Sequence, residues 1–475
     1  MLRVIDISLD YALLTDFYQL TMANGYLLKG IADQHAVFDL FFRKAPFNGV
    51  YAICYGLSKA ISDFYDMKFS EEDIEYLQEI KMFSDQFLEY LAKWKCQLTI
   101  RAVNDGRVIF PIEPVIEVEG PLIQCQLIET YLLNCFNFAT LCATKANRMW
   151  LISNRQPILE FGLRRAQGPN GGLIASEAAM VGGCSGTSNV LAGKKLGITA
   201  SGTQAHSWVM AFETELDAFR AYADHYPDSC ILLVDTYDTL KSGIPNAIKV
   251  GEELKAKGKK LVGVRLDSGD LADLSKKARK MLDKAGLTDV KIIASNDIDE
   301  YIIESIRSQN GAVDIWGIGT KLATCYDQPA LGGVYKLVEI DNKPKLKIAA
   351  EKTSIPSKKQ VFRVYNEEGF MMGDIIEIYN KEFQKEEKIY DPLNPLRFYK
   401  LSKPSKVEPL LQLKMKDGNP QEKFKDWRSA RKVMEEDIDH LSDASKRLLN
   451  PQTYNVSISR SLHELRTKLI ELHST

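Results

Sequence analysis

Between residues 158 and 320 the sequence repeats one pattern, in which a short apolar run ends in polar residues and a helical stretch follows. The apolar runs with their polar ends are ILEFGLRR, GCSGTSN, ITASGTQAH, ILLVDTYD, LVGVRLDSGD, KIIASNDID and DIWGIGT. Helical stretches between them include 245–258, 270–286 and 300–310. Strands that alternate with helices at this spacing pair in parallel through right-handed crossovers. Roughly seven such units favour an irregular α/β barrel over an open sheet, although periodicity alone does not decide between them.

The polar strand ends predict where the chemistry lies, because all strands of a parallel barrel open at their carboxyl ends on one face. His206 follows one strand, and a neutral imidazole can attack a phosphorus atom to form a covalent phosphoryl intermediate. Read alone, such a histidine is more often structural. Its position at a strand end favours a functional role.

A second strand end carries an aromatic ring and two cations. Phe161 can offer a ring face, and Arg164 or Arg165 can hold a planar carboxylate by two parallel hydrogen bonds. Core packing and a solvated surface pair are the plain alternatives. Because neighbours on a strand point to opposite faces, we expect at most one of the two arginines to reach a ligand.

Carboxylates gather at two further strand ends. Arg265 is suited to an anion, and Asp267 and Ser268 to ribose hydroxyls, whereas Asp270 can equally be the cap of the next helix. The strand end VDTYD, with Asp235 and Asp238, either holds Mg²⁺ on a pyrophosphate or forms a turn.

The last two strand ends are SNDID and GIGT. The first contains Ser295, Asn296 and Asp297. The second contains Gly317, Gly319 and Thr320, and a glycine-rich turn after a late barrel strand lets backbone N–H groups approach a phosphate. A lone G-x-G-T is also compatible with a simple tight turn. The chain has no P-loop or Rossmann fingerprint.

The remaining chain predicts three divisions: an N-terminal α+β domain (1–123), the barrel (124–337) and a C-terminal extension (338–475) that packs back on the N-terminal domain. The patterns predict helices at 16–29, 71–94, 122–152 and 423–472, and strands at 35–43 and 332–340. Tyr18 lies on the first of these helices, where plain core packing is the alternative to a binding role.

Composition limits the partners and the location. The net charge of −2 gives no whole-chain attraction to nucleic acid or to an anionic membrane, so a small-molecule partner is expected. The eight cysteines are scattered without a C-x-x-C pair, so neither a disulfide framework nor a structural zinc site is expected. No signal peptide or membrane-spanning run is evident, and the cytoplasm is the expected location.

The motifs TDFYQLTM, FPIEPVIEVEGPL, EFGLRRAQGP, GTSNV, GTQAHS, VDTYDT, GVRLDSGD, SNDID and GIGT, in this order, resemble the nicotinate phosphoribosyltransferase family. The likeness runs from about residue 15 to 337, with a weaker echo in WRSARK and LLNPQTY and a poor match over 341–399. It implies an irregular (β/α) barrel of the type II phosphoribosyltransferase kind, an N-terminal α/β-sandwich-like domain and a C-terminal α+β extension. It also implies a homodimer with a shared active site.

The resemblance assigns roles residue by residue. His206 matches the phosphorylated histidine, with Asp235 as a further catalytic residue. Positions matching the nicotinate site are Tyr18 (from the neighbouring subunit), Phe161, Arg164, Ser188, Thr203 and Arg265. Positions matching the phosphoribosyl pyrophosphate site are Asp267, Ser268, Asn296, Gly319 and Thr320, with Mg²⁺ near Asp235 and Asp267.

The residue at position 188 distinguishes nicotinate enzymes from the related nicotinamide enzymes within the superfamily, because the nicotinamide enzymes carry an aspartate where this chain has Ser188. An aspartate would repel a carboxylate at short range, whereas serine can donate to it. The resemblance therefore predicts ATP-dependent synthesis of nicotinate mononucleotide and pyrophosphate, the first step of NAD synthesis from nicotinate. The alternatives are transfer to nicotinamide or quinolinate, a metabolite-binding protein without catalysis, and a scaffold that docks through the charged C-terminal helix.

Overall fold

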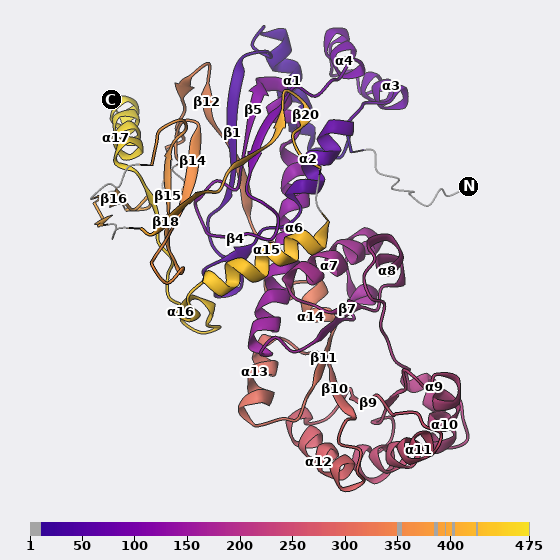
Figure 1. Cartoon of the computed structure of the whole chain (residues 1–475). Helices are drawn as coiled ribbons and strands as arrows, with labels where there is room; N and C mark the ends of the chain where they lie inside the picture. Colours follow the sequence, from indigo (N-terminus) through magenta and orange to yellow (C-terminus); the bar gives the residue numbers. More distant parts are fainter. Residues whose placement is uncertain are drawn as a thin grey trace. The chain divides into compact units, whose positions relative to one another are not determined.

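The computed structural model describes residues 11–348, 354–383, 388–394, 396–400, 404–423 and 426–474 (Figure 1). The chain divides into two compact units: residues 1–141 with 330–475, and residues 142–329. The sequence predicted divisions after residues 123 and 337. In the structure the chain passes from one unit to the other after residue 141, within helix α6 (Glu129–Ile152), and returns after residue 329. The two units are described in turn.

A six-stranded parallel sheet organises residues 142–329. Its order is β7-β6-β11-β10-β9-β8, and each neighbouring pair is parallel. The strands are β6 (Ile158–Glu160), β7 (Gly186–Thr187), β8 (Ile231–Leu233), β9 (Gly263–Leu266), β10 (Lys291–Asn296) and β11 (Ile315–Ile318). The predicted strand at ITASGTQAH contributes only a bridge from Ala200 to Thr187, and the strand pairing ends at β7 and β8 without closing. This is the irregular (β/α) barrel that the sequence predicted.

Helices follow the strands as expected for crossovers. They are α7 (Gly168–Gly182), α8 (Val190–Leu196), α9 (His206–Met210), α10 (Glu215–His225), α11 (Ile244–Ala256), α12 (Leu271–Lys284), α13 (Glu300–Ser308) and α14 (Thr320–Ala323). Helix α12 shows why these segments are helical: Leu271, Ser275, Ala278 and Leu282 recur every three or four residues and are buried. The apolar strands β9, β10 and β11 are buried almost throughout.

The other unit contains a seven-stranded sheet built from both ends of the chain. Its order is β13-β12-β1-β5-β3-β19-β20. The strands are β1 (His35–Phe42), β3 (Thr99–Ala102), β5 (Ile116–Pro121), β12 (Gly333–Ile340), β13 (Lys343–Pro344), β19 (Gln412–Lys416) and β20 (Asn419–Pro420). Strand β12 pairs with β1 and β19 pairs with β3, both antiparallel. The C-terminal third therefore completes the sheet that the N-terminal segment begins.

A second six-stranded sheet, in the order β17-β16-β21-β15-β14-β18, belongs to the same unit. Its strands are β14 (Lys359–Tyr365), β15 (Met371–Ile378), β16 (Ile389–Tyr390), β17 (Phe398–Tyr399), β18 (Lys406–Pro409) and β21 (Val456–Ile458). The prediction of one helix over 423–472 is wrong: α15 (Trp427–His440), α16 (Asp443–Lys446) and α17 (Arg460–Ser474) are separate, and β21 lies between the last two. A short two-stranded sheet joins β2 (Ala52–Ile53) to β4 (Val108–Ile109).

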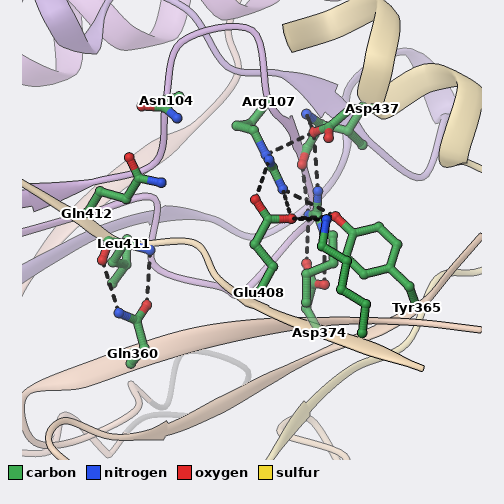
Figure 2. Close-up of polar contacts among 12 residues, drawn as sticks. Asn104, Arg107, Gln360, Tyr365, Asp374, Glu408, Leu411, Gln412 and Asp437 are labelled. Carbon is green, nitrogen blue, oxygen red and sulfur yellow. Dashed lines mark hydrogen bonds and ion pairs between the residues drawn. The ribbon is translucent and has the colours of Figure 1, made fainter. Parts of the chain in front are cut away.

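Buried polar contacts join segments that are distant in the sequence of this unit (Figure 2). Arg107, beside β4, contacts Glu408 of β18 at 2.8 Å and Asp437 of α15 at 3.0 Å. The Tyr365 hydroxyl donates to Glu408 at 2.7 Å. The side chain of Gln360 exchanges two hydrogen bonds with the backbone of Leu411, as Figure 2 also shows. These partly buried charged groups are paired, and their contacts connect α15 and β18 to the segment beside β4.

The predicted N-terminal helices are present, but two of them are divided. Helix α1 (Phe17–Leu28) agrees with the prediction, and α2 (Leu57–Asp66) follows β2. The segment predicted as one helix over 71–94 forms α3 (Glu71–Glu79), capped by Ser70, and α4 (Asp85–Ala92), capped by Ser84. The predicted helix 122–152 is divided at Ile128 into α5 (Leu122–Leu127) and α6. None of the described helices combines the length and the apolar character needed to cross a membrane.

Candidate active site

A cavity of about 410 Å³ lies at the carboxyl ends of the parallel strands. It is lined entirely by residues of the barrel unit. Those that the sequence singled out for the site are Phe161, Arg164, Ser188, Thr203, Arg265, Asp267, Asn296, Gly319 and Thr320. The strand ends after β6, β7, β9, β10 and β11 therefore contribute to one cavity.

Both arginines of the LRR segment line this cavity, whereas alternation along a strand predicted that at most one of them would reach a ligand. The argument assumed that the strand continues through them. Instead β6 ends at Glu160, and Leu163–Arg165 form the tight 3-10 turn η2. In a turn, side chains are not forced to alternate faces as they are in a strand. Both arginines therefore line the cavity together with Phe161 and Arg265.

Arg265 is held by three hydrogen bonds. Its Nε donates to Ser295 Oγ at 2.7 Å, its Nη1 to Thr203 Oγ1 at 3.1 Å and its Nη2 to Asp267 Oδ1 at 2.7 Å. Its guanidinium carbon lies 5.8 Å from the centre of the Phe161 ring. A guanidinium has five N–H groups, so Arg265 keeps donors for a ligand while its plane is fixed.

Asp267 connects the cavity to His206. Burial acts to raise the pKa of Asp267, but the hydrogen bond from Ser295 and the charge of Arg265 outweigh burial and lower that pKa. Asp267 Oδ2 is 3.8 Å from His206 Nε2. The Asp267 carboxylate therefore faces the Nε2 side of the His206 ring.

His206 begins helix α9 and its side chain is 42% exposed. Its Nδ1 is 3.1 Å from Thr236 Oγ1, so this ring nitrogen is engaged with the strand end after β8. His206 is not itself part of the cavity wall, but its neighbour Ala205 is. Both ring nitrogens thus face polar groups, and the ring remains partly exposed.

Asp235 and Ser268 lie next to Asp267, the carboxylate that faces this histidine. Asp235 Oδ2 accepts hydrogen bonds from the Asp267 backbone N–H at 2.8 Å and from Ser268 Oγ at 2.6 Å. The other oxygen, Asp235 Oδ1, is buried and has no hydrogen-bond partner. Such an orphaned oxygen is suited to a bound cation or a donor group.

The other two acidic candidates are helix caps. Asp238 accepts from the backbone N–H groups of Leu240 and Lys241, at the start of the helical turn Thr239–Gly243. Asp270 accepts from the backbone of Asp273 at 3.0 Å and caps α12. For these two residues the plain interpretation as turn and cap residues is confirmed.

Tyr18 belongs to the other compact unit. It lies on α1 and is 48% exposed, and burial together with Glu129 raises its pKa. Its role against a pyridine ring stays a prediction.

Two glycines of β11 and the following turn make room for Phe161. A Cβ atom on Gly317 would lie 2.8 Å from the Phe161 ring, and one on Gly319 would lie 3.1 Å from its carbonyl oxygen. Asn296, at the next strand end, has a positive φ of 124°, which non-glycine residues adopt rarely. The strand ends thus combine close packing with one strained residue facing the cavity.

Seven further residues line the cavity. Arg165 was predicted only as an alternative to Arg164, and Ser295, Asp297 and Gly317 were noted at strand ends without a ligand of their own. The cavity is also lined by Gly202, Gln204 and Ala205. All occur in strand-end segments that the pattern identified, so the missing information was side-chain direction. Ser295 illustrates this, because only the structure shows its contacts with Arg265 and Asp267.

Comparisons with known proteins agree with this architecture. Three family models match the chain: the nicotinate phosphoribosyltransferase N-terminal domain over residues 13–137, the nicotinate phosphoribosyltransferase family over 157–371, and the nicotinate phosphoribosyltransferase C-terminal domain over 358–466. Among the curated relatives, the nicotinate phosphoribosyltransferase of Bacillus subtilis is 40% identical over 482 residues, covering 96% of each chain. The human nicotinate phosphoribosyltransferase is 34% identical, also covering 96% of each chain.

Solved structures show the same fold. The crystal structure of human nicotinic acid phosphoribosyltransferase superposes with a TM-score of 0.87 at 32% identity, covering 96% of this chain and 100% of that one. A nicotinate-nucleotide pyrophosphorylase from Pyrococcus furiosus, at 24% identity and a TM-score of 0.70, shares the fold over 90% of this chain and 94% of its own. By its matches over nearly the whole length, and by the barrel whose strand ends meet in one polar cavity, this chain belongs to the nicotinate phosphoribosyltransferase family.

Proposed function

We propose that this protein transfers phosphoribose from 5-phosphoribosyl 1-pyrophosphate to nicotinate, giving nicotinate mononucleotide and pyrophosphate, and that ATP drives the transfer through a phosphorylated His206. The observation that carries the proposal is the single cavity that combines an aromatic ring, guanidinium groups and sugar-binding carboxylates. Membership of the family supports the transfer reaction, and the side chains that line the cavity support the roles proposed for individual residues.

Nicotinate would lie at the β6 and β7 side of the cavity. The Phe161 ring offers a face for the pyridine, and a guanidinium such as that of Arg164 can hold the carboxylate by two hydrogen bonds. Ser188 can donate a further hydrogen bond, and Thr203 and Arg265 add donors nearby. In the proposed homodimer, Tyr18 of the partner subunit would cover the opposite face of the ring.

Phosphoribosyl pyrophosphate would bind at the β9, β10 and β11 side. Asp267, Ser268 and Asn296 supply acceptors and donors for the ribose hydroxyls. The turn at Gly319 and Thr320 begins α14 and supplies backbone N–H groups for the 5′-phosphate.

The carboxylates beside this site fit Mg²⁺. Proteins bind Mg²⁺ through one or two carboxylates together with substrate phosphates and water, so a complete protein cage is not needed. Asp235 has a buried oxygen without a hydrogen-bond partner, and Asp267 is the neighbouring carboxylate. When bound, the metal would neutralise charge on the departing pyrophosphate.

In the transfer itself, the pyridine nitrogen forms a bond to ribose C1 as the bond from C1 to the pyrophosphate oxygen breaks. The protein's contribution is to position the two reactants and to stabilise the charge that develops. In the ATP half-reaction, a ring nitrogen of His206 forms a bond to the γ-phosphorus and ADP leaves. Water later releases phosphate from the histidine. Asp267, 3.8 Å from Nε2, stabilises the positive charge on the ring in between.

The test is an assay of purified protein with nicotinate and phosphoribosyl pyrophosphate, with and without ATP. We expect nicotinate mononucleotide to form faster with ATP, and His206→Ala to abolish the ATP stimulation. His225→Ala, an exposed histidine at the end of α10, is the matched control and should keep it. Full ATP-coupled turnover by His206→Ala would show that phosphohistidine is not part of the mechanism.

A further inference from the structure

Glu160 is a buried carboxyl group directly beneath the candidate nicotinate site. It is the last residue of β6 and is 0% exposed. Its side chain accepts hydrogen bonds from the backbone N–H of Gly162, from Ser176 Oγ at 2.9 Å and from Thr187 Oγ1 at 2.6 Å. All three donors are neutral, and no described cation forms an ion pair with Glu160.

The contacts of Glu160 lead to both sides of the site. Gly162 lies between Phe161 and Arg164, in the chain that forms the turn η2. Thr187 directly precedes Ser188, and the Ser188 N–H donates to the Glu160 carbonyl oxygen at 2.9 Å. One residue therefore holds the segment with the ring and the guanidinium groups against the segment with the serine.

The packing around this contact leaves no room for adjustment. A Cβ atom on Gly162 would lie 2.3 Å from Ala323 Cβ, 2.9 Å from Glu160 Oε1 and 2.9 Å from the Gly319 carbonyl oxygen. On the other side, Thr187 Oγ1 also accepts from the Asn189 N–H at 3.0 Å. A shift of the Glu160 side chain would therefore displace the backbone on which the site residues stand.

We propose that Glu160 is a positioning residue for nicotinate, fixing the Phe161–Arg164 segment and Ser188 at the separation that the substrate requires. It touches no substrate atom and acts through Gly162 and Thr187. The inference rests on the proposed function and adds to it a residue that determines affinity for the pyridine substrate. Stability alone is a poor reason for this group, because an apolar residue can be buried without a polar group's desolvation cost.

The test compares variants of the full-length protein. Glu160→Ala should raise the KM and the calorimetric Kd for nicotinate about 10- to 100-fold, because small displacements of binding groups have effects of this size. The KM for phosphoribosyl pyrophosphate should change less, by about threefold or under. Glu160→Gln should rescue most of the nicotinate affinity, because its amide oxygen can accept from Gly162 and the two hydroxyls can accept from its NH₂ group.

Two further variants separate positioning from stability. Thr187→Val removes one contact at the site and should also raise the KM for nicotinate. Ser275→Ala removes a buried hydroxyl of α12 that bonds Ala272 and Ala312, away from the cavity, and should lower the melting temperature without changing that KM.

The outcomes decide the inference. If Glu160→Ala and Thr187→Val leave the KM and Kd for nicotinate at the wild-type values, Glu160 does not position the substrate. If Glu160→Ala does not fold, Thr187→Val carries the decision in the same way. Failure of the wild-type protein to make nicotinate mononucleotide would instead overturn the proposed function, which is a separate result.

Discussion

Ser188 and the two arginines illustrate what single residues decide in this cavity. Ser188 follows β7 and lines the same cavity as Arg164 and Arg165. A neutral donor in a cavity that two arginines also line suits an anionic ligand. The resemblance to the family, rather than the strand pattern, singled out Ser188 as the discriminating position, and that role stays a prediction. The direction of Arg165 could not be predicted, because it depends on the chain leaving β6 as a 3-10 turn.

Ser188→Asp is expected to shift preference from nicotinate toward nicotinamide. Two like charges about 4 Å apart repel by ~1 kcal/mol in water and ~4 kcal/mol near a protein surface, so the KM for nicotinate should rise about tenfold or more. The amide of nicotinamide carries no charge and can donate to the new carboxylate. Steady-state kinetics with both pyridines measure the change, and Ser188→Asn controls for side-chain size. An unchanged ratio of the two kcat/KM values would show that Ser188 does not determine which pyridine is preferred.

At the scale of secondary-structure elements, the sequence predicted best what local chemistry controls. Alternation of apolar runs and helices located β6 to β11. The errors occur where distant packing decides. ITASGTQAH has a strand pattern yet gains only one bridge, and the charged segment 423–472 contains β21 because β15 provides a parallel partner for it.

Asp267 and Asp270 show the same limit within one strand-to-helix connection. The sequence could not separate a ligand-binding carboxylate from a helix cap, because both residues are aspartates and either position, between a strand and a helix, suits either role. The partners separate them: Asp267 receives hydrogen bonds from Arg265 and Ser295, whereas Asp270 receives one from the first turn of α12.

Asp270→Ala should therefore weaken α12 and leave the chemistry intact. Loss of an N-cap costs about 1 kcal/mol of unfolding free energy, and we expect the KM for phosphoribosyl pyrophosphate to stay within about twofold of the wild-type value. Urea denaturation and initial-rate kinetics measure the two quantities. Asp267→Ala is the comparison that should damage activity. A large rise in KM for Asp270→Ala at unchanged stability would assign Asp270 to the site instead.

For the whole molecule, the main finding is that both ends of the chain build one unit. β1 pairs with β12, and β3 pairs with β19, more than 300 residues later in the chain. The sequence predicted that the extension packs back on the N-terminal segment only as a general expectation, because pairing between strands so far apart leaves no local pattern. The ion pairs of Arg107 with Glu408 and Asp437 join the same distant segments (Figure 2).

This network predicts a specific loss of stability in acid. Burial acts to raise the pKa of Glu408, but the hydrogen bond and charge of Arg107, with the Tyr365 hydroxyl, lower it to about 2 from the ordinary value of 4.5. A carboxyl group with a lowered pKa in the folded state stabilises the fold fully above the unfolded-state pKa. That contribution, about 2 to 3 kcal/mol, should be lost as the pH falls from about 4.5 toward 2.

The measurement is the difference in unfolding free energy between the wild-type protein and Glu408→Gln, followed by chemical denaturation from pH 7 down to the lowest pH at which both fold. The difference should be largest near neutral pH and should shrink toward zero in acid, because the protonated glutamate and the glutamine then make equivalent contacts with Arg107. Glu75→Gln on the exposed face of α3 measures the background effect of losing one carboxyl group elsewhere. A difference that stays constant down to pH 3 would mean that Arg107 does not hold Glu408 ionised, and that β18 and α15 are fixed by apolar packing instead.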